Sequence, residues 1–403
     1  MSQPSGITVS YFGVHQAFQL ALAAQELGRL DKFYCSMIDA PGKWGWWLGK
    51  FFGKADLINR RCAGLDPRFA FEIPGPLIRE RLSHKFSTPQ KHARWFQTSI
   101  DFDRRVAGQL RTTRSKIFIG TETCARDSFR VAGKIGLTKI LDCPQAHPQF
   151  LHQLLAAAAE DLRLPPFGSF DSPEIRDRKL EEFETADILL MISEFQQQSF
   201  LAAGFPAEKL FVVEWGIDVD FWRPPATPKK SQKEVPLRLL FVGSLGFRKG
   251  IPYLMQALDK CDAPVELAMV GVNNKETDRF ISGVRAPVKY LGTKNKVELR
   301  EIYWESDVLV LPSLVDTYGL VALEAMACGL PVIVTENCGV PVPDPGWRVP
   351  IMNSNAIAQR LENYAKNREA LVRDGQSAQQ FARQFTPQRY RKQIKDLLQK
   401  YVS

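Results

Sequence analysis

The chain of 403 residues contains no apolar run that approaches the roughly 20 residues of a membrane span. Cysteine is scarce and irregular, with seven residues and no Cys-x-x-Cys spacing. This pattern argues against a disulfide framework or a zinc site and favours reduced thiols in the cytosol. Five histidines, none spaced as His-x-x-x-His, give no metal signal, and residues 1–6 lack the basic and apolar regions of a secretory signal.

Acidic residues are scarce in one region, where positive charge accumulates. The net charge is +9, and residues 43–139 hold 20 Lys and Arg against 8 Asp and Glu. Within that region, residues 43–54 interleave tryptophan, phenylalanine and lysine. Two interpretations remain open: a segment that lies on an anionic membrane surface, or a loop whose aromatic rings pack on its own domain. No recognised motif supports nucleic-acid binding.

Short apolar strands alternate with helices in two arrays, which predicts an α/β protein with doubly wound parallel sheets. A Pro/Lys-rich stretch at 224–231 separates the arrays and is typical of a linker. The expected strands are 7–12, 116–120, 139–142 and 187–193, then 237–243, 265–270, 288–291, 307–311 and 331–335.

The domain prediction has three parts. An N-terminal domain is expected over 1–215, with an insertion of helices and loops at about 40–112. A C-terminal domain is expected over 216–385, and a closing helix over 386–403.

The most informative segment is 311–333, which predicts a strand, a turn, a helix that opens near Gly319, and a second strand. Asp316 lies in the turn, and Glu324 lies on the helix eight positions later. A helix N-terminus offers unpaired amides and the positive end of a dipole, which suit a phosphate. A carboxylate can accept hydrogen bonds from two neighbouring sugar hydroxyls. Diphosphate, ribose and hexose together describe a nucleotide sugar.

This segment resembles the C-terminal signature of the retaining GT-B glycosyltransferases of family 4 (glycosyl transferases group 1), E-x7-E followed by A-x-A-x-G-x-P-V. Asp316 stands in place of the first Glu. Residues 204–210 and 216–224 resemble the crossover between the two domains of that family, with Trp215 where Asn is common. The resemblance implies two Rossmann-like domains that face a cleft, the first for the acceptor and the second for the nucleotide-sugar donor.

Residues 243–250 resemble the family's G-R-L-x-x-x-K-G loop, whose cations hold the donor diphosphate. Lys249 occupies the Lys position and Ser244 the Arg position, so Arg248 is the candidate for the missing charge. By resemblance, Asp316 would hold hexose hydroxyls and Glu324 the ribose. The predicted donor-binding set is completed by Gly243, Tyr318, Gly319 and Leu320.

In the first half, Gly13 and His15 follow the opening strand, where the family has a Gly-rich loop near the donor phosphates. His147 follows a later strand, and relatives often place a histidine there that contacts the sugar, so it is the predicted catalytic histidine. Asp142 and Glu122, also near strand ends, are its rivals.

The predicted function is the transfer of a hexose, with retention and without a metal or other cofactor, from a nucleoside-diphosphate sugar to a hydroxyl acceptor. The acceptor would be a glycan, a lipid-linked glycan or a polysaccharide precursor. The expected location is the cytoplasm, with peripheral contact to the inner membrane surface as one possibility. Two alternatives stay open: a GT-B epimerase or phosphorylase, and a non-catalytic nucleotide-sugar-binding or scaffold protein with a degenerate site.

Overall fold

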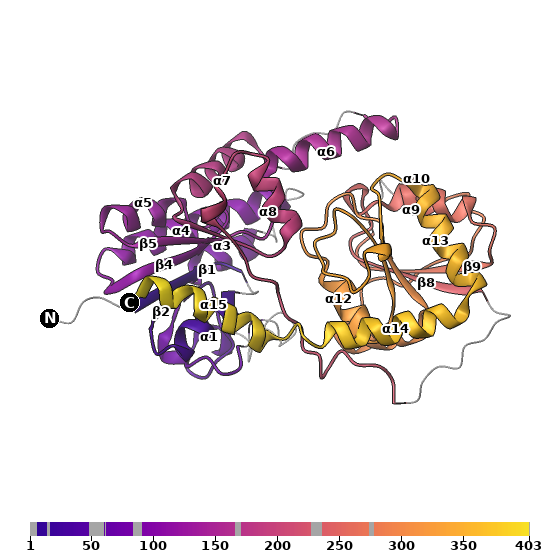
Figure 1. Cartoon of the computed structure of the whole chain (residues 1–403). Coiled ribbons are helices and arrows are strands. Elements are labelled where there is room, and N and C mark those ends of the chain that lie inside the picture. The colour runs from indigo at the N-terminus through magenta and orange to yellow at the C-terminus, as the bar shows by residue number, and fades with distance from the viewer. Residues whose placement is uncertain are drawn as a thin grey trace.

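The computed structural model describes residues 6–13, 17–47, 60, 62–83, 91–165, 171–226, 236–273 and 278–402. Two parallel sheets, each covered by helices, form two units joined side by side (Figure 1). The prediction of two doubly wound parallel sheets is therefore confirmed. Across the described ranges, no helix is both long and apolar enough to cross a membrane.

The N-terminal sheet has seven strands in the order β3-β2-β1-β4-β5-β6-β7. Its strands are β1 (Gly6–Tyr11), β2 (Leu30–Cys35), β3 (Ala70–Glu72), β4 (Ser115–Thr121), β5 (Thr138–Asp142), β6 (Ile188–Met191) and β7 (Leu210–Val212). Its helices are α1 (Ala17–Glu26), α3 (Gly75–Ser83), α4 (Lys91–Leu110), α5 (Arg126–Lys134), α6 (Pro148–Asp161), α7 (Pro173–Thr185) and α8 (Glu194–Leu201).

The C-terminal sheet has six strands in the order β10-β9-β8-β11-β12-β13. Its strands are β8 (Leu237–Val242), β9 (Val265–Val270), β10 (Val288–Tyr290), β11 (Val308–Leu311), β12 (Val332–Thr335) and β13 (Arg348–Val349). The helices of this half are α9 (Ile251–Lys260), α10 (Asp278–Ile281), α11 (Lys296–Glu305), α12 (Leu320–Ala327), α13 (Ser354–Lys366), α14 (Arg368–Ala382) and α15 (Pro387–Val402).

Most strands that sequence reasoning located are central and largely buried, and the exception is β10, which lies at the sheet edge and is mostly exposed. All four residues of β6, β11 and β12 are buried, as expected for central parallel strands. The strands it missed, β2, β3, β7 and β13, lie toward the sheet edges and are short or partly polar. Within the predicted insertion at 40–112, β3 pairs in parallel with β2, so part of that region belongs to the sheet.

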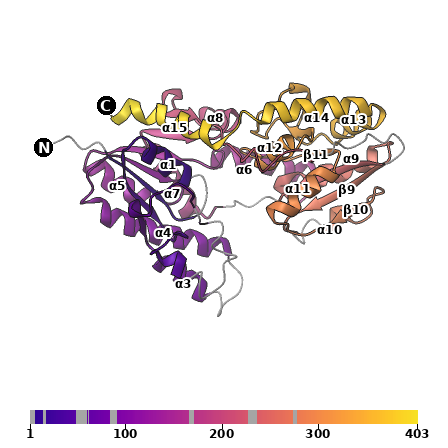
Figure 2. The same cartoon turned by 90° about the horizontal axis from the view of Figure 1, so that it is seen from below.

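Helix α15 returns from the C-terminal unit and lies against α1 of the N-terminal unit, as both views show (Figures 1 and 2). Arg391 and Lys395 of α15 pair with Glu26 at the end of α1, at 2.6 Å and 2.7 Å. The chain thus crosses between the units twice. The two crossings touch, because the Ile217 amide donates to the Phe385 carbonyl at 3.0 Å.

Candidate active site

Both sheets have a topological switch point, where the strand order reverses and ligands bind beyond the carboxyl ends of the strands. In the C-terminal sheet this point lies between β8 and β11. The loop after β8 contains residues 243–250, and the loop after β11 contains residues 312–319. These are the two loops in which the sequence predicted the donor site.

Glycines allow the two loops to pack closely. Gly250 has a φ of +72°, and a Cβ there would lie 1.8 Å from the Pro312 carbonyl oxygen. Gly243 is approached in the same way, since a Cβ on Gly271 would lie 1.7 Å from the Gly243 carbonyl oxygen. Only a residue without a side chain fits at Gly250 and Gly271.

The loops also join through charge. Lys249 Nζ lies 2.5 Å from Asp316 Oδ2, and their side chains are 21% and 13% exposed. Arg248 Nε donates to the Val315 carbonyl at 3.2 Å. Burial lowers the pKa of Arg248, and the nearby Asp316 carboxylate opposes that shift. Two cations and one carboxylate therefore meet at the switch point. Ser244, which occupies the Arg position of the family's loop, is exposed.

The N-terminus of α12 completes this part of the site. Gly319 precedes the helix with a φ of +77°, and a Cβ there would lie 2.6 Å from Cys338 Sγ. No side chain caps this end of the helix, which begins at Leu320. Tyr318 points elsewhere: its hydroxyl donates to the Trp215 carbonyl at 2.6 Å, and it is 2% exposed. The Tyr318 side chain therefore stabilises the crossing between the units, and only its backbone borders the site.

Glu324 lies on α12, where Tyr303 of α11 donates a hydrogen bond to it at 3.3 Å. Burial raises the pKa of this carboxyl to about 7, although the tyrosine hydrogen bond and Lys296 act in the opposite direction. Its protonation thus changes near neutral pH.

His147 is not at the cleft. Its ring is 4% exposed and lies 5.2–6.0 Å, centroid to centroid, from Phe200, Phe205 and Phe183. Burial lowers its pKa to about 4, so the imidazole is neutral at physiological pH. This placement contradicts the predicted catalytic role, because the ring belongs to an apolar core. Sequence reasoning misplaced it because the position after a strand does not show which way the side chain turns.

The other predicted residues of the first half differ in outcome. His15 lies outside the described residues. Gly13 follows β1, and a Cβ there would approach the Tyr11 ring to 3.0 Å, so the glycine accommodates that ring. Asp142 and Glu122 are both buried at the carboxyl ends of central strands, with 5% of each exposed.

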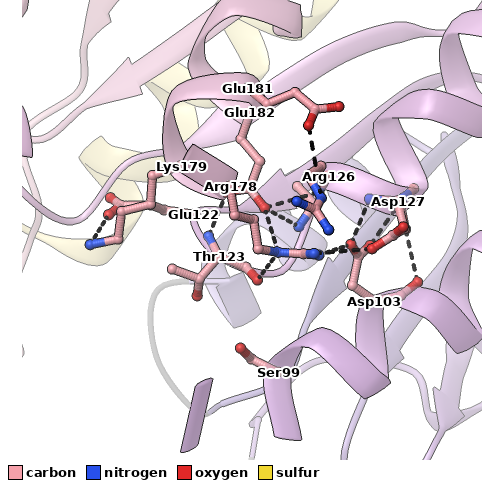
Figure 3. Close-up of polar contacts among 12 residues, drawn as sticks. Ser99, Asp103, Glu122, Thr123, Arg126, Asp127, Arg178, Lys179, Glu181 and Glu182 are labelled. Carbon is pink, nitrogen blue, oxygen red and sulfur yellow. Dashed lines mark hydrogen bonds and ion pairs between the residues drawn. The ribbon is translucent and has the colours of Figure 1, made fainter. Parts of the chain in front are cut away.

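The N-terminus of α5 is occupied by buried carboxylates of the protein itself (Figure 3). Glu182 accepts hydrogen bonds from the amides of Thr123, Ala125 and Arg126 at 2.6–3.0 Å. Asp103 accepts from the next two amides, those of residues 127 and 128, at 2.8 Å and 3.1 Å. The protein's own carboxylates therefore occupy this positive helix end.

Arg178 lies at the centre of this buried network and is 0% exposed (Figure 3). It donates to the Thr123 carbonyl and to Asp127 at 3.0 Å each, and it pairs with Asp103 and Glu182. Sequence reasoning missed the network because a helix rich in Arg, Lys and Glu is usually exposed to solvent.

The carboxyl edges of the two sheets meet near the donor loops. Ser193, which follows β6, donates to the Thr317 carbonyl at 2.6 Å, next to Asp316. Helix α6 extends toward the C-terminal unit (Figure 2), where Tyr253 of α9 donates to Asp161 at 2.8 Å. In the described part of the chain, no group of three His, Cys, Asp or Glu side chains is arranged to hold a metal ion.

Comparison with known proteins agrees with this geometry. Residues 236–367 match the family model for Glycosyl transferases group 1. The D-inositol 3-phosphate glycosyltransferase of Corynebacterium jeikeium is 30% identical over 242 residues, covering 53% of this chain and 56% of that protein. The matches to the first three curated relatives span 63%, 56% and 47% of their lengths.

Solved structures match nearly the whole chain. Sucrose-phosphate synthase from Thermosynechococcus elongatus superposes with a TM-score of 0.67 at 17% identity, over 98% of both chains. HepE from Anabaena, crystallised with UDP and glucose, superposes with a TM-score of 0.64 at 16% identity, over 98% of this chain and 100% of that one. These similarities confirm the GT-B fold.

Proposed function

We propose that this protein is a retaining glycosyltransferase that moves a hexose from a nucleoside-diphosphate sugar to a hydroxyl acceptor. The observation that carries the proposal is the Lys249–Asp316 pair at the switch point, beside the uncapped N-terminus of α12. It combines a cation for the diphosphate with a carboxylate for the sugar. The match of residues 236–367 to the family model for Glycosyl transferases group 1 supports the same function.

Each group has a role in the proposed transfer. Lys249, Arg248 and the N-terminus of α12 stabilise the negative charge that develops on the leaving diphosphate. Asp316 accepts hydrogen bonds from hexose hydroxyls, and Glu324 accepts them from the ribose.

The ion pair prepares the site for the donor. While no donor is bound, Lys249 and Asp316 neutralise each other. When the diphosphate enters, Lys249 exchanges the carboxylate for a phosphate, and Asp316 becomes available to the hexose. Neither charge is left without a partner in either state, which avoids the large cost of desolvating an unpaired charge.

We further propose that transfer needs no divalent metal. Lys249 and Arg248, together with the helix dipole, supply the positive charge that a metal would otherwise bring to a diphosphate. Because HepE is described in complex with UDP and glucose, UDP-sugars are the first donors to test. The acceptor is proposed only as a hydroxyl on a glycan, a lipid-linked glycan or a polysaccharide precursor.

The test is the release of nucleoside diphosphate from a panel of UDP-, GDP- and ADP-sugars, with and without EDTA. We expect one donor to be hydrolysed slowly and equally in both conditions. Lys249→Ala should weaken donor binding about 10- to 140-fold, because one charge-assisted contact contributes about 1.5–3 kcal/mol. Lys260→Ala is the matched control, since Lys260 pairs with Ser354 on α13.

The same experiment separates the alternatives. UDP binding without turnover, even with added glycan acceptors, would favour a binding protein with a degenerate site. A sugar product with changed configuration at one ring carbon would favour an epimerase. Formation of a sugar phosphate would favour a phosphorylase. Loss of activity in EDTA that added metal restores would contradict the proposed metal independence.

Peripheral membrane contact is a separate proposal, supported by two exposed aromatic side chains. Trp44 and Trp47 are 60% and 50% exposed, whereas the Lys43 ammonium is held by the Ala70 carbonyl at 2.6 Å. Residues 48–54 of the predicted segment lie outside the described residues. We expect co-sedimentation with vesicles that contain phosphatidylserine, and loss of it in the Trp44→Ala/Trp47→Ala variant. Equal pelleting of the variant would contradict this proposal.

A further inference from the structure

Three polar side chains meet at the switch point of the N-terminal sheet. Tyr11 ends β1, Glu122 follows β4 and Asp142 ends β5, and these three strands are neighbours in the sheet. Thr121 lies opposite Asp142 in the register, and the Glu122 amide donates to the Asp142 carbonyl at 3.1 Å. The two carboxyl groups therefore leave the same edge of the sheet on adjacent strands.

Glu122 is held in place by a buried lysine. Lys179 of α7 is 2% exposed and lies 3.0 Å from Glu122 Oε1 and 2.7 Å from Asp171. The next residue, Thr123, has a φ of +72° and is bound by Glu182 and Arg178 (Figure 3). The other carboxyl oxygen of Glu122, Oε2, is buried and has no hydrogen-bond partner within the described residues.

Asp142 differs from Glu122 because no cation pairs with it in the described part of the chain. Burial and the neighbouring Glu122 raise its pKa to about 7. Tyr11 of β1, the adjacent Cys143 and Tyr390 of α15 are other titratable groups near it, and their own pKa values are raised by burial and by this carboxylate. Around neutral pH, Asp142 can therefore both accept and release a proton.

The chain after Asp142 leads directly to the donor loop. Gln196 of α8 donates to the carbonyls of Cys143 and Gln145 at 2.7 Å each, which fixes this turn. Ala146 then belongs to the same buried apolar cluster as Leu314 and Val315 of the C-terminal unit, which precede Asp316. The carboxyl end of β5 thus faces the loop proposed to hold the hexose.

We propose that Asp142 is the catalytic base that takes the proton from the acceptor hydroxyl, and that Glu122, held by Lys179, binds a second acceptor hydroxyl. This inference rests on the transferase function proposed above. In the step, the acceptor O–H bond breaks and its proton passes to the Asp142 carboxylate. The acceptor oxygen forms a bond to the anomeric carbon on the same face from which the diphosphate oxygen departs, as the bond from that carbon to the diphosphate oxygen breaks, so the configuration is retained. The diphosphate leaves with the electron pair.

The competing route transfers the proton to the leaving diphosphate and needs no protein base. A nucleophile without a proton distinguishes the two routes. Azide attacks the anomeric carbon as an anion, so it bypasses the loss of a base but does not bypass the loss of a donor-binding residue.

The experiment measures release of nucleoside diphosphate from the donor found in the panel, with water as acceptor and then with sodium azide. For Asp142→Asn we expect release in water to fall about 10²- to 10⁴-fold, the usual contribution of a general base. UDP affinity by calorimetry should stay within about twofold of the wild type, well below the effect of one lost charge-assisted contact. Azide should restore release and yield the glycosyl azide.

Two control variants accompany Asp142→Asn, one expected to lose activity and one expected to keep it. Asp316→Ala should lose release in water and gain nothing from azide, because it lacks a group that holds the donor. Asp187→Asn, at the opposite edge of the same sheet and paired with Lys139, should behave as the wild type.

Release in water within about threefold of the wild type would overturn the role of Asp142, since a base contributes far more. Loss of UDP binding in Asp142→Asn, or failure of azide to restore release, would also overturn it, by making the residue structural. If the wild type neither binds UDP nor releases diphosphate from any donor, the proposed function fails first, and this inference fails with it.

Discussion

At the scale of single residues, burial sets the protonation of the carboxyl groups on which the proposed site depends. Glu324 is an example, because desolvation raises its pKa to about 7 and outweighs the Tyr303 hydrogen bond. The ionised form accepts hydrogen bonds from ribose hydroxyls through both oxygens, whereas the protonated form has less acceptor capacity. The affinity for UDP should therefore depend on pH near neutrality.

We expect the Kd for UDP to increase as the pH falls from about 8 to about 6, through the raised pKa of Glu324. The sign follows from the carboxylate being present above that pKa and absent below it. Glu324→Gln should bind more weakly and should lose this part of the pH dependence, because the amide does not titrate. Calorimetry across this range tests it. Glu369→Gln, exposed on α14, should retain the wild-type profile, and an unchanged slope in Glu324→Gln would contradict the assignment.

A second residue-scale prediction concerns the turn after β8. Gly250→Ala places a Cβ 1.8 Å from the Pro312 oxygen at a φ of +72°. A non-glycine residue in this conformation costs about 1–3 kcal/mol, and the clash adds to it. Urea unfolding should show a loss of at least that size. Gly246→Ala, in the same loop but with no atom within 4 Å of its Cβ, should change the free energy of unfolding by less than about 0.5 kcal/mol.

At the scale of elements, the N-terminus of α5 depends on a network of buried charges. Arg178 offsets the carboxylates of Asp103 and Glu182, which are 0% exposed and bind the first amides of the helix. The network joins α4, α5 and α7, three helices far apart in sequence. It also supports Thr123 and, through it, the position of Glu122.

Arg178→Met should lower the free energy of unfolding by about 3–5 kcal/mol, because it leaves buried carboxylates without a cation. Arg130→Met is the matched control: Arg130 is 52% exposed, and its pair with Glu181 should contribute less than about 1 kcal/mol. Urea denaturation of both variants compares the two pairs directly. Equal losses would show that burial does not decide the contribution of these ion pairs.

At the scale of the whole molecule, two chain crossings lie side by side. We expect them to act as the hinge for closure of the cleft. Gly216 belongs to the first crossing and lies against the second, because a Cβ on Gly216 would lie 2.2 Å from the Thr386 carbonyl carbon. Tyr318 anchors the first crossing through Trp215. Closure would exclude water from the donor and limit its hydrolysis.

Gly216→Ala should therefore force the crossings apart and misalign the two edges of the cleft. We expect kcat/KM for transfer to fall about 10²-fold, as an ångström-scale misplacement commonly does, with kcat and KM both affected. X-ray scattering should also show a smaller donor-induced decrease in the radius of gyration. The control is Gly108→Ala on α4, where a Cβ meets no atom within 4 Å. This variant should show the wild-type decrease in the radius of gyration. Normal closure in Gly216→Ala would exclude the crossings as the hinge.

The sequence by itself determined the two arrays, the central strands and the position of the two loops proposed to bind the donor. These follow from local properties: strands buried on both faces form apolar runs, and glycine is needed where φ is positive or the backbone comes close. The spacing of Asp316 and Glu324 across a turn and a helix is local in the same sense. For this reason the sequence pattern alone predicts that Lys249, Asp316 and Gly319 lie near one another.

Only the tertiary structure decided the acceptor side. His147 follows a strand, as predicted, yet its ring turns into a core of three phenylalanines. The pair of Glu122 and Lys179 joins residues 57 positions apart, through crossovers whose geometry no local pattern encodes. Periodicity shows which residues are buried, whereas the choice of neighbours depends on how strands are ordered in the sheet. That order brings Asp142 and Glu122 together at the same edge of the sheet.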